Sequence, residues 1–374
     1  MHVTRAILAA ALLAVLAAGG LTAQQKKKPG SDDEGYVPVV APEGKNSKNK
    51  KKEQDLNQTL PPQRELPSTI AAETGRLAFQ VSPLSSRGLL SQQTRDALKA
   101  LLKNNHGTIV KLRAFVAGSG DLRRVGELAG ELFTERRQPL PVLTVVQVGA
   151  LPMEGAQIVI ESTETDRKVV NPNGVAFLSA QPAANVAESL DKLKALLAAN
   201  GMQPSDALSV TCFVSALDAP RDTQSLTAAG FSGAAFNYVQ MRREPVTPAA
   251  ACEARARMAK TASSIDPQVA LISSPQVVFT GTQLAFGAQD ADLNLAFDRL
   301  AKALASMNTS LRQAVTSHLY VASNGTAAQA FAKQTAHWGS RPPASTMLPI
   351  EGLPSLDAPL GIEVVAVADA SAGR

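Results

Sequence analysis

The sequence predicts an α+β protein built from three copies of one β-α-β-α-β-β unit. Amphipathic helices recur at intervals of roughly 100 residues, and runs rich in β-branched and aromatic residues flank each of them. The stretch PVLTVVQVGALP (141–152) also has a counterpart, PASTMLPIEGLP (343–354). Both begin with Pro, carry Thr at the fourth place and close on Leu-Pro, which indicates one element used more than once.

Each copy contains a first helix with a single apolar stripe. Leu, Ala or Phe recur at steps of three and four residues, which brings their side chains to one helix face. These helices are QQTRDALKALLKN (92–104), NVAESLDKLKALLAANG (185–201) and LNLAFDRLAKALASMN (293–308). A second helix is expected at 121–136 and at 326–339, whereas its counterpart in the middle copy, SLTAAGFSG (225–233), is degenerate.

Strands are expected before the first helix, between the two helices and after the second helix of each copy. Those before the first helix are RLAFQVSPL (76–84), GVAFLSAQP (174–182) and QVVFTGTQLAF (276–286). Those between the helices are GTIVKLRAFVAG (107–118), ALSVTCFVSALD (207–218) and QAVTSHLYVAS (313–323). The closing pairs are LTVVQVGAL with AQIVIESTE, AAFNYVQMRR with PAAACEARARM, and STMLPIEGL with LGIEVVAVA.

The pattern predicts three domains at 70–165, 166–262 and 263–374. Each would form a sheet with both helices on one face, so its other face needs a cover. Three such sheets in one chain can cover one another in a closed, three-sided core with the helices outside.

The N-terminal segment has the features of an export signal. Arg5 precedes the apolar run AILAAALLAVLAA, and LTA followed by QQ fits a cleavage site after Ala23. We therefore expect residues 1–23 to be a signal peptide, the mature protein to be secreted or periplasmic, and no transmembrane anchor to remain after cleavage.

Residues 24–69 read as a disordered basic tether. They are polar, low in complexity and rich in Lys, Pro and Gly. The net charge of +5 includes Arg5 and a net +2 from this segment, so the folded part carries only about +2. With an aromatic content of 4%, this excludes the electrostatic and stacking signature of nucleic-acid binding.

The sequence contains no motif typical of a metal site or of a phosphate-bearing cofactor. None of the four histidines is spaced for a metal, and no Gly-rich phosphate loop follows a strand. The two cysteines, Cys212 and Cys252, match no metal motif, and in an oxidising compartment they could pair. We therefore expect no cofactor and no metal.

The order of elements and several motifs resemble the Rid (YjgF-like, RidA) family of imine/enamine deaminases. Resembling segments are QTRDALKALL, LTVVQVGALP and GAQIVIE in the first copy, VAFLSAQP and ACEARARM in the second, and VVFTGTQ, FDRLAKAL, RPPASTMLPIEGLP and GIEVVAVA in the third. The resemblance covers about 70–374 and implies a chorismate-mutase-like fold. Because the family forms homotrimers with clefts between subunits, it also implies an intrachain pseudo-trimer that is a monomer in solution.

The resemblance places the family's carboxylate-gripping arginine third in the stretch quoted first. That place holds Leu143 in the first copy and Ser345 in the third, with Ala235 or Phe236 in the second. The family's water-placing glutamate falls on Glu161 and Glu253, whereas the third copy has Val365 there and Glu363 two residues earlier. Glu161 and Glu253 are thus the candidate catalytic residues, with solvent-facing strand ends as the alternative reading.

The resemblance also implies a set of ligand-binding residues and one disulfide. Ser179, Gln181 and Gln283 lie near the family's Ser-Gly-Gln cleft stretch and complete the candidate set with Leu143 and Ser345, although they could equally satisfy loop backbone groups. In the family's sheet the strands that carry Cys212 and Cys252 are neighbours, so a cross-strand disulfide is our hypothesis, with two buried free thiols as the alternative.

These observations predict an exported RidA-like protein that lacks the carboxylate-binding arginine and binds a small ligand between domains or serves as a scaffold. Whether it is an enzyme stays open at this point. One alternative is a hydrolase of the 2-iminobutanoate/2-iminopropanoate type with a remodelled cleft. Another is an envelope-associated interaction protein that uses the tether.

Overall fold

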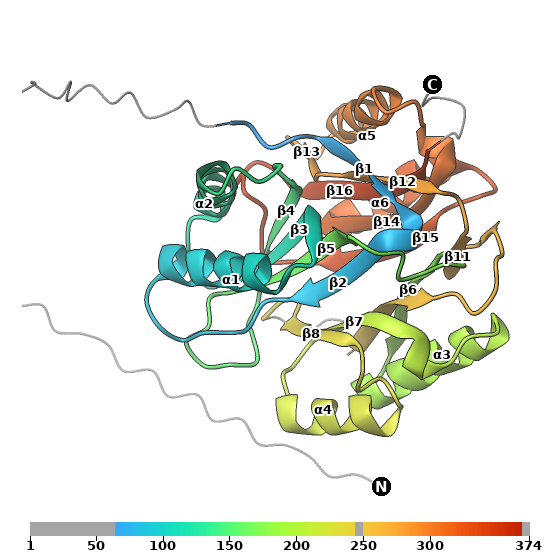
Figure 1. Ribbon diagram of the computed structural model, residues 1–374. Helices are drawn as coiled ribbons and strands as arrows, with labels where there is room; N and C mark the ends of the chain where they lie inside the picture. The colour runs from blue at the N-terminus through green and yellow to red at the C-terminus, as the bar shows by residue number, and fades with distance from the viewer. Residues whose placement is uncertain (1–63, 244–249, 369–374) are drawn as a thin grey trace, which may run out of the picture. The chain divides into compact units, whose positions relative to one another are not determined.

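The structure is a computed structural model, and it describes residues 64–243 and 250–368, all within the compact unit Pro61–Arg374 (Figure 1). The predicted signal peptide and nearly all of the predicted tether lie outside the described residues. Within the part described there are three mixed sheets and six α-helices. The predicted α+β class is confirmed, with one sheet and two helices for each repeat of the sequence.

The first unit forms a four-stranded sheet in the order β2-β5-β3-β4, in which only β3 and β4 are parallel. Its elements are β2 (Leu77–Val81), α1 (Leu90–Asn104), β3 (Gly107–Ala117), α2 (Leu122–Glu135), β4 (Val142–Val148) and β5 (Ile158–Asp166).

The second unit forms a sheet in the order β10-β11-β6-β9-β7-β8. Its elements are β6 (Val175–Ala183), α3 (Val186–Ala199), β7 (Ala207–Val214), α4 (Ala219–Ala228), β8 (Ala235–Gln240), β9 (Ala250–Arg257), β10 (Ser264–Ile265) and β11 (Val269–Ile272). The middle copy thus still has a second helix, α4, of ten residues, but it begins before the degenerate stretch 225–233 and ends within that stretch, at Ala228.

The third unit forms a sheet in the order β1-β12-β16-β14-β15, with β13 also paired to β16. Its elements are β12 (Gln276–Thr280), β13 (Gln283–Ala285), α5 (Asp290–Ala305), β14 (Ala314–Val321), α6 (Asn324–Trp338), β15 (Ala344–Pro349) and β16 (Leu360–Val367). They are joined by β1 (Thr69–Glu73), the first of the described strands. Three short 3-10 turns, Thr74–Arg76, Pro204–Asp206 and Leu311–Gln313, complete the described elements.

Local sequence signals explain where several helices begin. The side chains of Asp121, Asn185 and Ser323 accept hydrogen bonds from free backbone N–H groups in the first turns of α2, α3 and α6. Along α3, Leu190, Leu193 and Leu197 form the buried stripe that the sequence predicts.

Two strands extend the sheet of a neighbouring repeat. β11 lies just before β12 in sequence but pairs with β6 of the second sheet, from Val269↔Leu178 to Ile272↔Val175. β1 lies just before β2 but pairs with β12 of the third sheet, from Thr69↔Thr280 to Glu73↔Gln276. The first described strand is thereby attached to the third unit. Ser68, placed by sequence in the tether, accepts a backbone hydrogen bond from Gly281.

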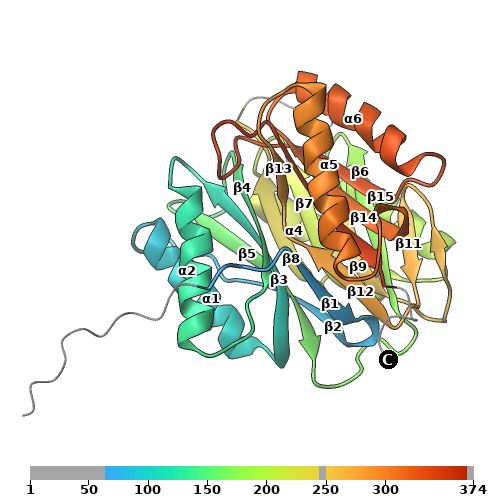
Figure 2. The ribbon, with the colours of Figure 1, turned by 90° about the horizontal axis from the view of Figure 1, so that it is seen from above.

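Helices cover one face of each sheet, and the other faces meet (Figure 2). Three apolar clusters each join the helices of one unit to its own sheet. Two further clusters draw side chains from all three sheets: one contains Phe115, Phe213 and Tyr320, and the other contains Phe177, Phe279 and Val110. This is the three-sided packing that burial of the free sheet faces predicts.

The predicted domain boundaries at 165/166 and 262/263 stay predictions. β10 and β11 follow residue 262 in sequence, and both belong to the second sheet. No helix among the described residues is long and apolar enough to cross a membrane.

Candidate functional site

The three units place equivalent residues at equivalent registers on the inner faces of their sheets. The strand between the helices shifts register against the last strand at the same place in each unit, after Ile109, Ala207 and Ala314. Beyond that shift, the facing pairs are Arg113↔Glu161, Thr211↔Glu253 and His318↔Glu363. The assignment of Val365 as the third glutamate position is therefore wrong. Glu363 occupies it, since it is the fourth residue of its strand, like Glu161 and Glu253.

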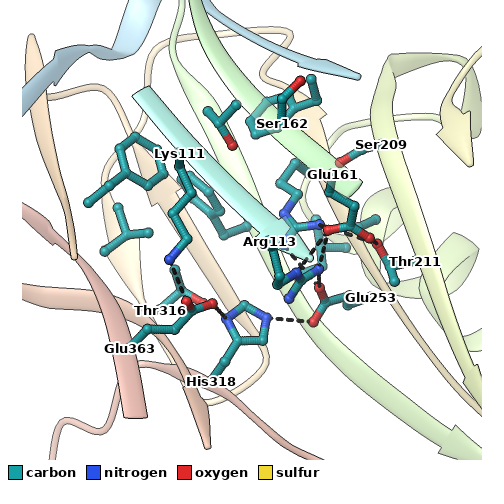
Figure 3. Close-up of a pocket in the computed structure, with 18 of the residues that line it drawn as sticks. Lys111, Arg113, Glu161, Ser162, Ser209, Thr211, Glu253, Thr316, His318 and Glu363 are labelled. Carbon is teal, nitrogen blue, oxygen red and sulfur yellow. Dashed lines mark hydrogen bonds and ion pairs between the residues drawn. The ribbon is translucent and has the colours of Figure 1, made fainter. Parts of the chain in front are cut away.

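The three glutamates converge on a buried ion network that joins the sheets (Figure 3). Arg113 donates from Nε and Nη2 to Glu161 Oε2, at 2.8 and 2.6 Å, and from Nη2 to Glu253 Oε1 at 2.7 Å. The other oxygen of Glu161 accepts hydrogen bonds of 2.7 Å from Thr211 Oγ1 and Asn237 Nδ2. Glu161 is thus held by groups from two units.

The third unit extends the same network. His318 Nε2 lies 2.8 Å from Glu253 Oε2, and His318 Nδ1 lies 3.5 Å from Glu363 Oε1. Glu363 also contacts Lys111 and Thr144 of the first unit and accepts a 2.9 Å hydrogen bond from Tyr320.

Two further cations complete the charge balance. Arg255 Nη2 lies 3.0 Å from Glu253 Oε1. Lys111 uses its remaining donors on Thr144 Oγ1, at 3.0 Å, and on the backbone oxygen of Thr280, at 2.7 Å. The positive charges of Lys111, Arg113 and Arg255 balance those of the three glutamates, and His318 adds a fourth positive charge only when it is protonated.

The electrostatics keep all three carboxyl groups ionised. Burial alone would raise their pKa values, but nearby cations more than offset it. The pKa of Glu161 is lowered by Arg113 and Arg255, and that of Glu253 is lowered well below its usual value by His318 and Arg113. The pKa of Glu363 falls to about 2 because of Lys111 and His318. Carboxylates with such low pKa values and saturated hydrogen bonds are poor general bases near neutral pH.

The residues at the place of the family's carboxylate-binding arginine lie outside this network. The register pairs Leu143, Phe236 and Ser345 with equivalent residues, which identifies Phe236 rather than Ala235 as the second-copy counterpart. Leu143 lines an inter-unit groove of about 350 Å³ together with residues 281–284. Phe236 stacks on Tyr238 with ring centroids 6.2 Å apart. The Ser345 hydroxyl is engaged by Ser317 and by Gln334, the latter at 2.6 Å.

The three other ligand-binding candidates divide between two environments. Ser179 Oγ donates to the backbone oxygens of Pro267 and Gln268, and Gln181 donates to the oxygen of Ser179. Both are buried, and their side chains satisfy backbone oxygens, two in the turn before β11 and one within β6. Gln283 lies in β13 and lines the same groove as Leu143.

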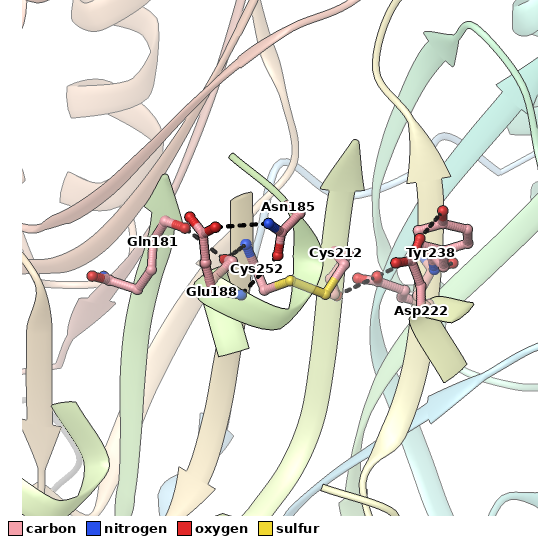
Figure 4. Close-up of a disulfide and its surroundings, with 11 residues drawn as sticks. Gln181, Asn185, Glu188, Cys212, Asp222, Tyr238 and Cys252 are labelled. Atoms are coloured by element: carbon pink, nitrogen blue, oxygen red, sulfur yellow. Dashed lines mark hydrogen bonds between the residues drawn. A yellow bond between two sulfur atoms is a disulfide. The ribbon is translucent and has the colours of Figure 1, made fainter. Parts of the chain in front are cut away.

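Cys212 and Cys252 face each other across β7 and β9 and form a disulfide (Figure 4). Both are fully buried in the helix-side core of the second unit. A disulfide of this kind is typical of proteins that fold in an oxidising compartment. Among the described residues, no group of three or more His, Cys, Asp or Glu is arranged to hold a metal ion.

Sequence reasoning missed Lys111, Arg113 and His318, and it placed the third glutamate position at Val365, two residues beyond Glu363. A usable signal existed in KLRAF, where two cations alternate with apolar residues in a strand expected to be buried on both faces.

Comparisons with known proteins give fold-level likenesses of single units. No family model matches the chain, and no curated protein matches its sequence. Similar solved structures include Rv2704 of Mycobacterium tuberculosis, a member of the YjgF/YER057c/UK114 family, at 19% identity over 25% of this chain and 79% of that one, with a TM-score of 0.24. Yeast Mmf1 matches at 21% identity over 29% of this chain and 90% of its own, also with a TM-score of 0.24. RidA from the Antarctic bacterium Psychrobacter matches at 17% identity over 24% and 80%, with a TM-score of 0.23.

Proposed function

We propose that this chain is an exported, non-catalytic binding protein that carries the Rid-type fold as a single-chain pseudo-trimer. The observation that carries the proposal is the identity of the residues at one equivalent position of β4, β8 and β15. Leu143, Phe236 and Ser345 occupy the place where the resemblance puts the carboxylate-gripping arginine, and none of them supplies a cation. A planar, bidentate guanidinium is the side chain best suited to hold a carboxylate.

The proposed water-placing residues are equally unsuited to the family's reaction. Glu161 and Glu253 are buried in the ion network, and their oxygens are already occupied by Arg113, Thr211, Asn237 and His318. An imino acid brought to them would have to displace these partners, which would leave buried polar groups without hydrogen bonds.

The groove beside Leu143 is the binding site that we favour. It lies between the first and third units, and most of its lining is apolar, including Leu122, Val145, Leu284 and Pro354. Such a lining suits an uncharged or weakly polar small molecule. The segment Leu66–Ser68 also lines it, so the end of the predicted tether contributes to the site.

The test is an assay of the purified protein with 2-iminopropanoate generated in place. The expected result is loss of the imine at the rate of buffer alone, with an active Rid-family deaminase assayed in parallel. Separately, Nile red should bind and fluoresce, and Gly126→Leu should abolish that binding, because a side chain at Gly126 projects toward Leu143. Imine hydrolysis above the buffer rate would overturn the proposal.

A second candidate, an imine hydrolase with a rebuilt cleft, is favoured by one observation. Arg123 lines the same groove and donates from Nε to the oxygen of Pro354 at 3.1 Å, so a guanidinium stands at its rim. If hydrolysis is observed, Arg123→Gln should remove most of it, while Arg124→Gln on the next residue should not. The envelope-interaction alternative depends on the tether, of which residues 24–63 lie outside the described residues.

A further inference from the structure

The first sheet has a free edge at the place where the other two sheets are extended. Among the described residues, β2 pairs only with β5, whereas the equivalent strands β6 and β12 each carry an added antiparallel strand, β11 and β1. The length of the connection explains the difference. β5 ends at Asp166 and β6 begins at Val175, so the segment between them reaches only the start of β2, where Asn171 Nδ2 donates to the oxygen of Leu77.

Phe79 and Val81 direct their backbone groups to this free edge. Ser82, the residue that follows β2, donates its N–H to the oxygen of Ile160 in β5. Because the backbone groups of successive residues in a strand point to opposite sides, those of Phe79 and Val81 point away from β5. The side chain of Phe79 is half-buried, whereas the phenylalanines at the same register of β6 and β12 are buried. The edge therefore leaves both hydrogen-bonding groups and apolar surface uncovered.

The segments that cover the two equivalent edges have a common pattern. They read Pro-Ser-Thr-Ile at 67–70 and Pro-Gln-Val-Ala at 267–270. The backbone oxygen of the second residue in each accepts the N–H of the residue equivalent to Val81. The fourth residue, Ile70 or Ala270, pairs directly with the phenylalanine of the covered strand. The free edge of β2 thus fits an extended segment with proline first and an apolar residue in the fourth place.

We propose that the free edge of β2 binds an extended segment of another protein, which joins the first sheet as an antiparallel strand. This segment reads Pro-x-(Thr or Val)-(Ile or Ala), accepts the N–H of Val81 at its second residue and packs its fourth residue on Phe79. Main-chain hydrogen bonds of this kind provide affinity, and the alternate side chains provide specificity. The sequence of β2, LAFQV, contains neither a charge nor a proline, the residues that protect many edge strands from added partners.

The proposal is independent of the groove beside Leu143, to which β2 contributes no residue. The probe is a labelled peptide that copies residues 66–71, LPSTIA, and its binding to the purified protein is followed by fluorescence anisotropy. Saturable binding is expected. The same peptide with Ile70→Pro should not bind, because it has lost the N–H that pairs with the backbone oxygen of Phe79.

Val81→Pro in the protein should weaken binding of the peptide about tenfold, the effect of losing one hydrogen bond. The ladder to β5 should persist, because the N–H of Val81 points away from that strand. The matched control is Val81→Ala, which shortens the same side chain but keeps the N–H, and it should retain binding.

A cross-link locates the peptide on β2 without depending on the proline variant. Gln80 is equivalent to Thr280, which pairs with Thr69. Gln80→Cys should therefore form a mixed disulfide with a peptide that carries Thr69→Cys. A peptide that carries Ile70→Cys should not react, because its thiol would lie on the other face of the sheet. The native cysteines are bonded to each other and do not compete.

Absence of saturable binding, equal binding of the Ile70→Pro peptide, or equal cross-linking of the two cysteine peptides would each overturn the proposal. A dimer that Val81→Pro converts to a monomer would assign the edge to a second copy of this chain. Binding seen only after removal of residues 24–63 would assign it to the chain's own N-terminal segment. Either of these results would also overturn the proposal of a separate partner.

Discussion

Arg113 of the first unit lies 2.7 Å from Glu253 of the second, and both side chains are only 3% exposed. Glu253 in turn contacts His318 of the third unit, so one carboxylate connects all three sheets. Buried ion pairs of this kind cost desolvation energy and are weak evidence for stability in themselves. Removing one partner of such a pair should nevertheless destabilise the fold strongly, because an unpaired buried charge costs far more free energy than a matched pair.

Removing Lys111 alone should therefore be more damaging than removing it with its partner. Lys111→Met leaves Glu363 buried without its main cation, and we expect a loss of about 3 kcal/mol in the free energy of unfolding. Combining it with Glu363→Gln should recover most of this loss. Urea unfolding of the single and double variants gives the coupling energy, and costs that simply add would contradict the pairing.

Acid should weaken the fold through the same glutamate. The pKa of Glu363 is about 2 in the folded protein, below its value of 4.5 in an unperturbed chain. A carboxyl group with a lowered folded-state pKa contributes stability above its unfolded pKa, and this is lost as the pH falls through the folded value. We expect a decline of about 3 kcal/mol between about pH 4.5 and pH 2, since one pKa unit corresponds to about 1.4 kcal/mol.

The contribution of Glu363 can be separated from that of other acids with Glu363→Gln. In this variant the free energy of unfolding should depend less on pH across the same window. An unchanged pH dependence would show that Glu363 titrates as an ordinary carboxyl group.

The disulfide should resist reductant until the protein unfolds, because Cys212 and Cys252 are fully buried. It closes a loop with a sequence separation of 40, so its loss should lower the free energy of unfolding by about 3–4 kcal/mol on the loop-entropy estimate. Thiol titration in denaturant should find no free thiol before reduction and two after it. Two thiols without reductant would contradict the bond, and Cys212→Ala with Cys252→Ala measures its contribution.

Gly126 offers a stabilising change in the interior of α2. A Cβ there would meet Leu143 Cδ2 at 3.5 Å, an ordinary contact, and the residue needs no unusual backbone conformation. Gly126→Ala should raise the free energy of unfolding by about 0.5–1 kcal/mol, because alanine has the higher helix propensity. Gly107→Ala serves as the contrast: its Cβ would lie 1.8 Å from the oxygen of Thr165, so it should destabilise the protein.

The repeat was predictable because its signals are local. The stripe of Leu190, Leu193 and Leu197 and the period of the strands depend on near neighbours in sequence, and the free sheet faces then require three-sided packing. The network was not predictable, because Arg113, Glu253 and His318 meet only through the register of three sheets. Counting along the third copy selected Val365 instead of Glu363 for the same reason: the register is fixed by pairing with β14.

The pairing of β1 with β12 of the third sheet is the least local feature of the fold and the most direct to test. Three residues, Thr74–Arg76, separate β1 from β2, a spacing that would also suit a hairpin that pairs Ala72 with Ala78. The structure instead pairs Ala72 with Val277 of β12, and the backbone N–H of Thr74 donates to the oxygen of Pro275.

Ala72→Cys combined with Val277→Cys should therefore form a second disulfide, because directly paired residues of antiparallel strands lie close enough to bridge. Peptide mapping without reduction should detect it alongside the native bond. Ala72→Cys with Ala78→Cys is the matched control and should stay reduced, and the opposite outcome would show that β1 folds back on its own unit.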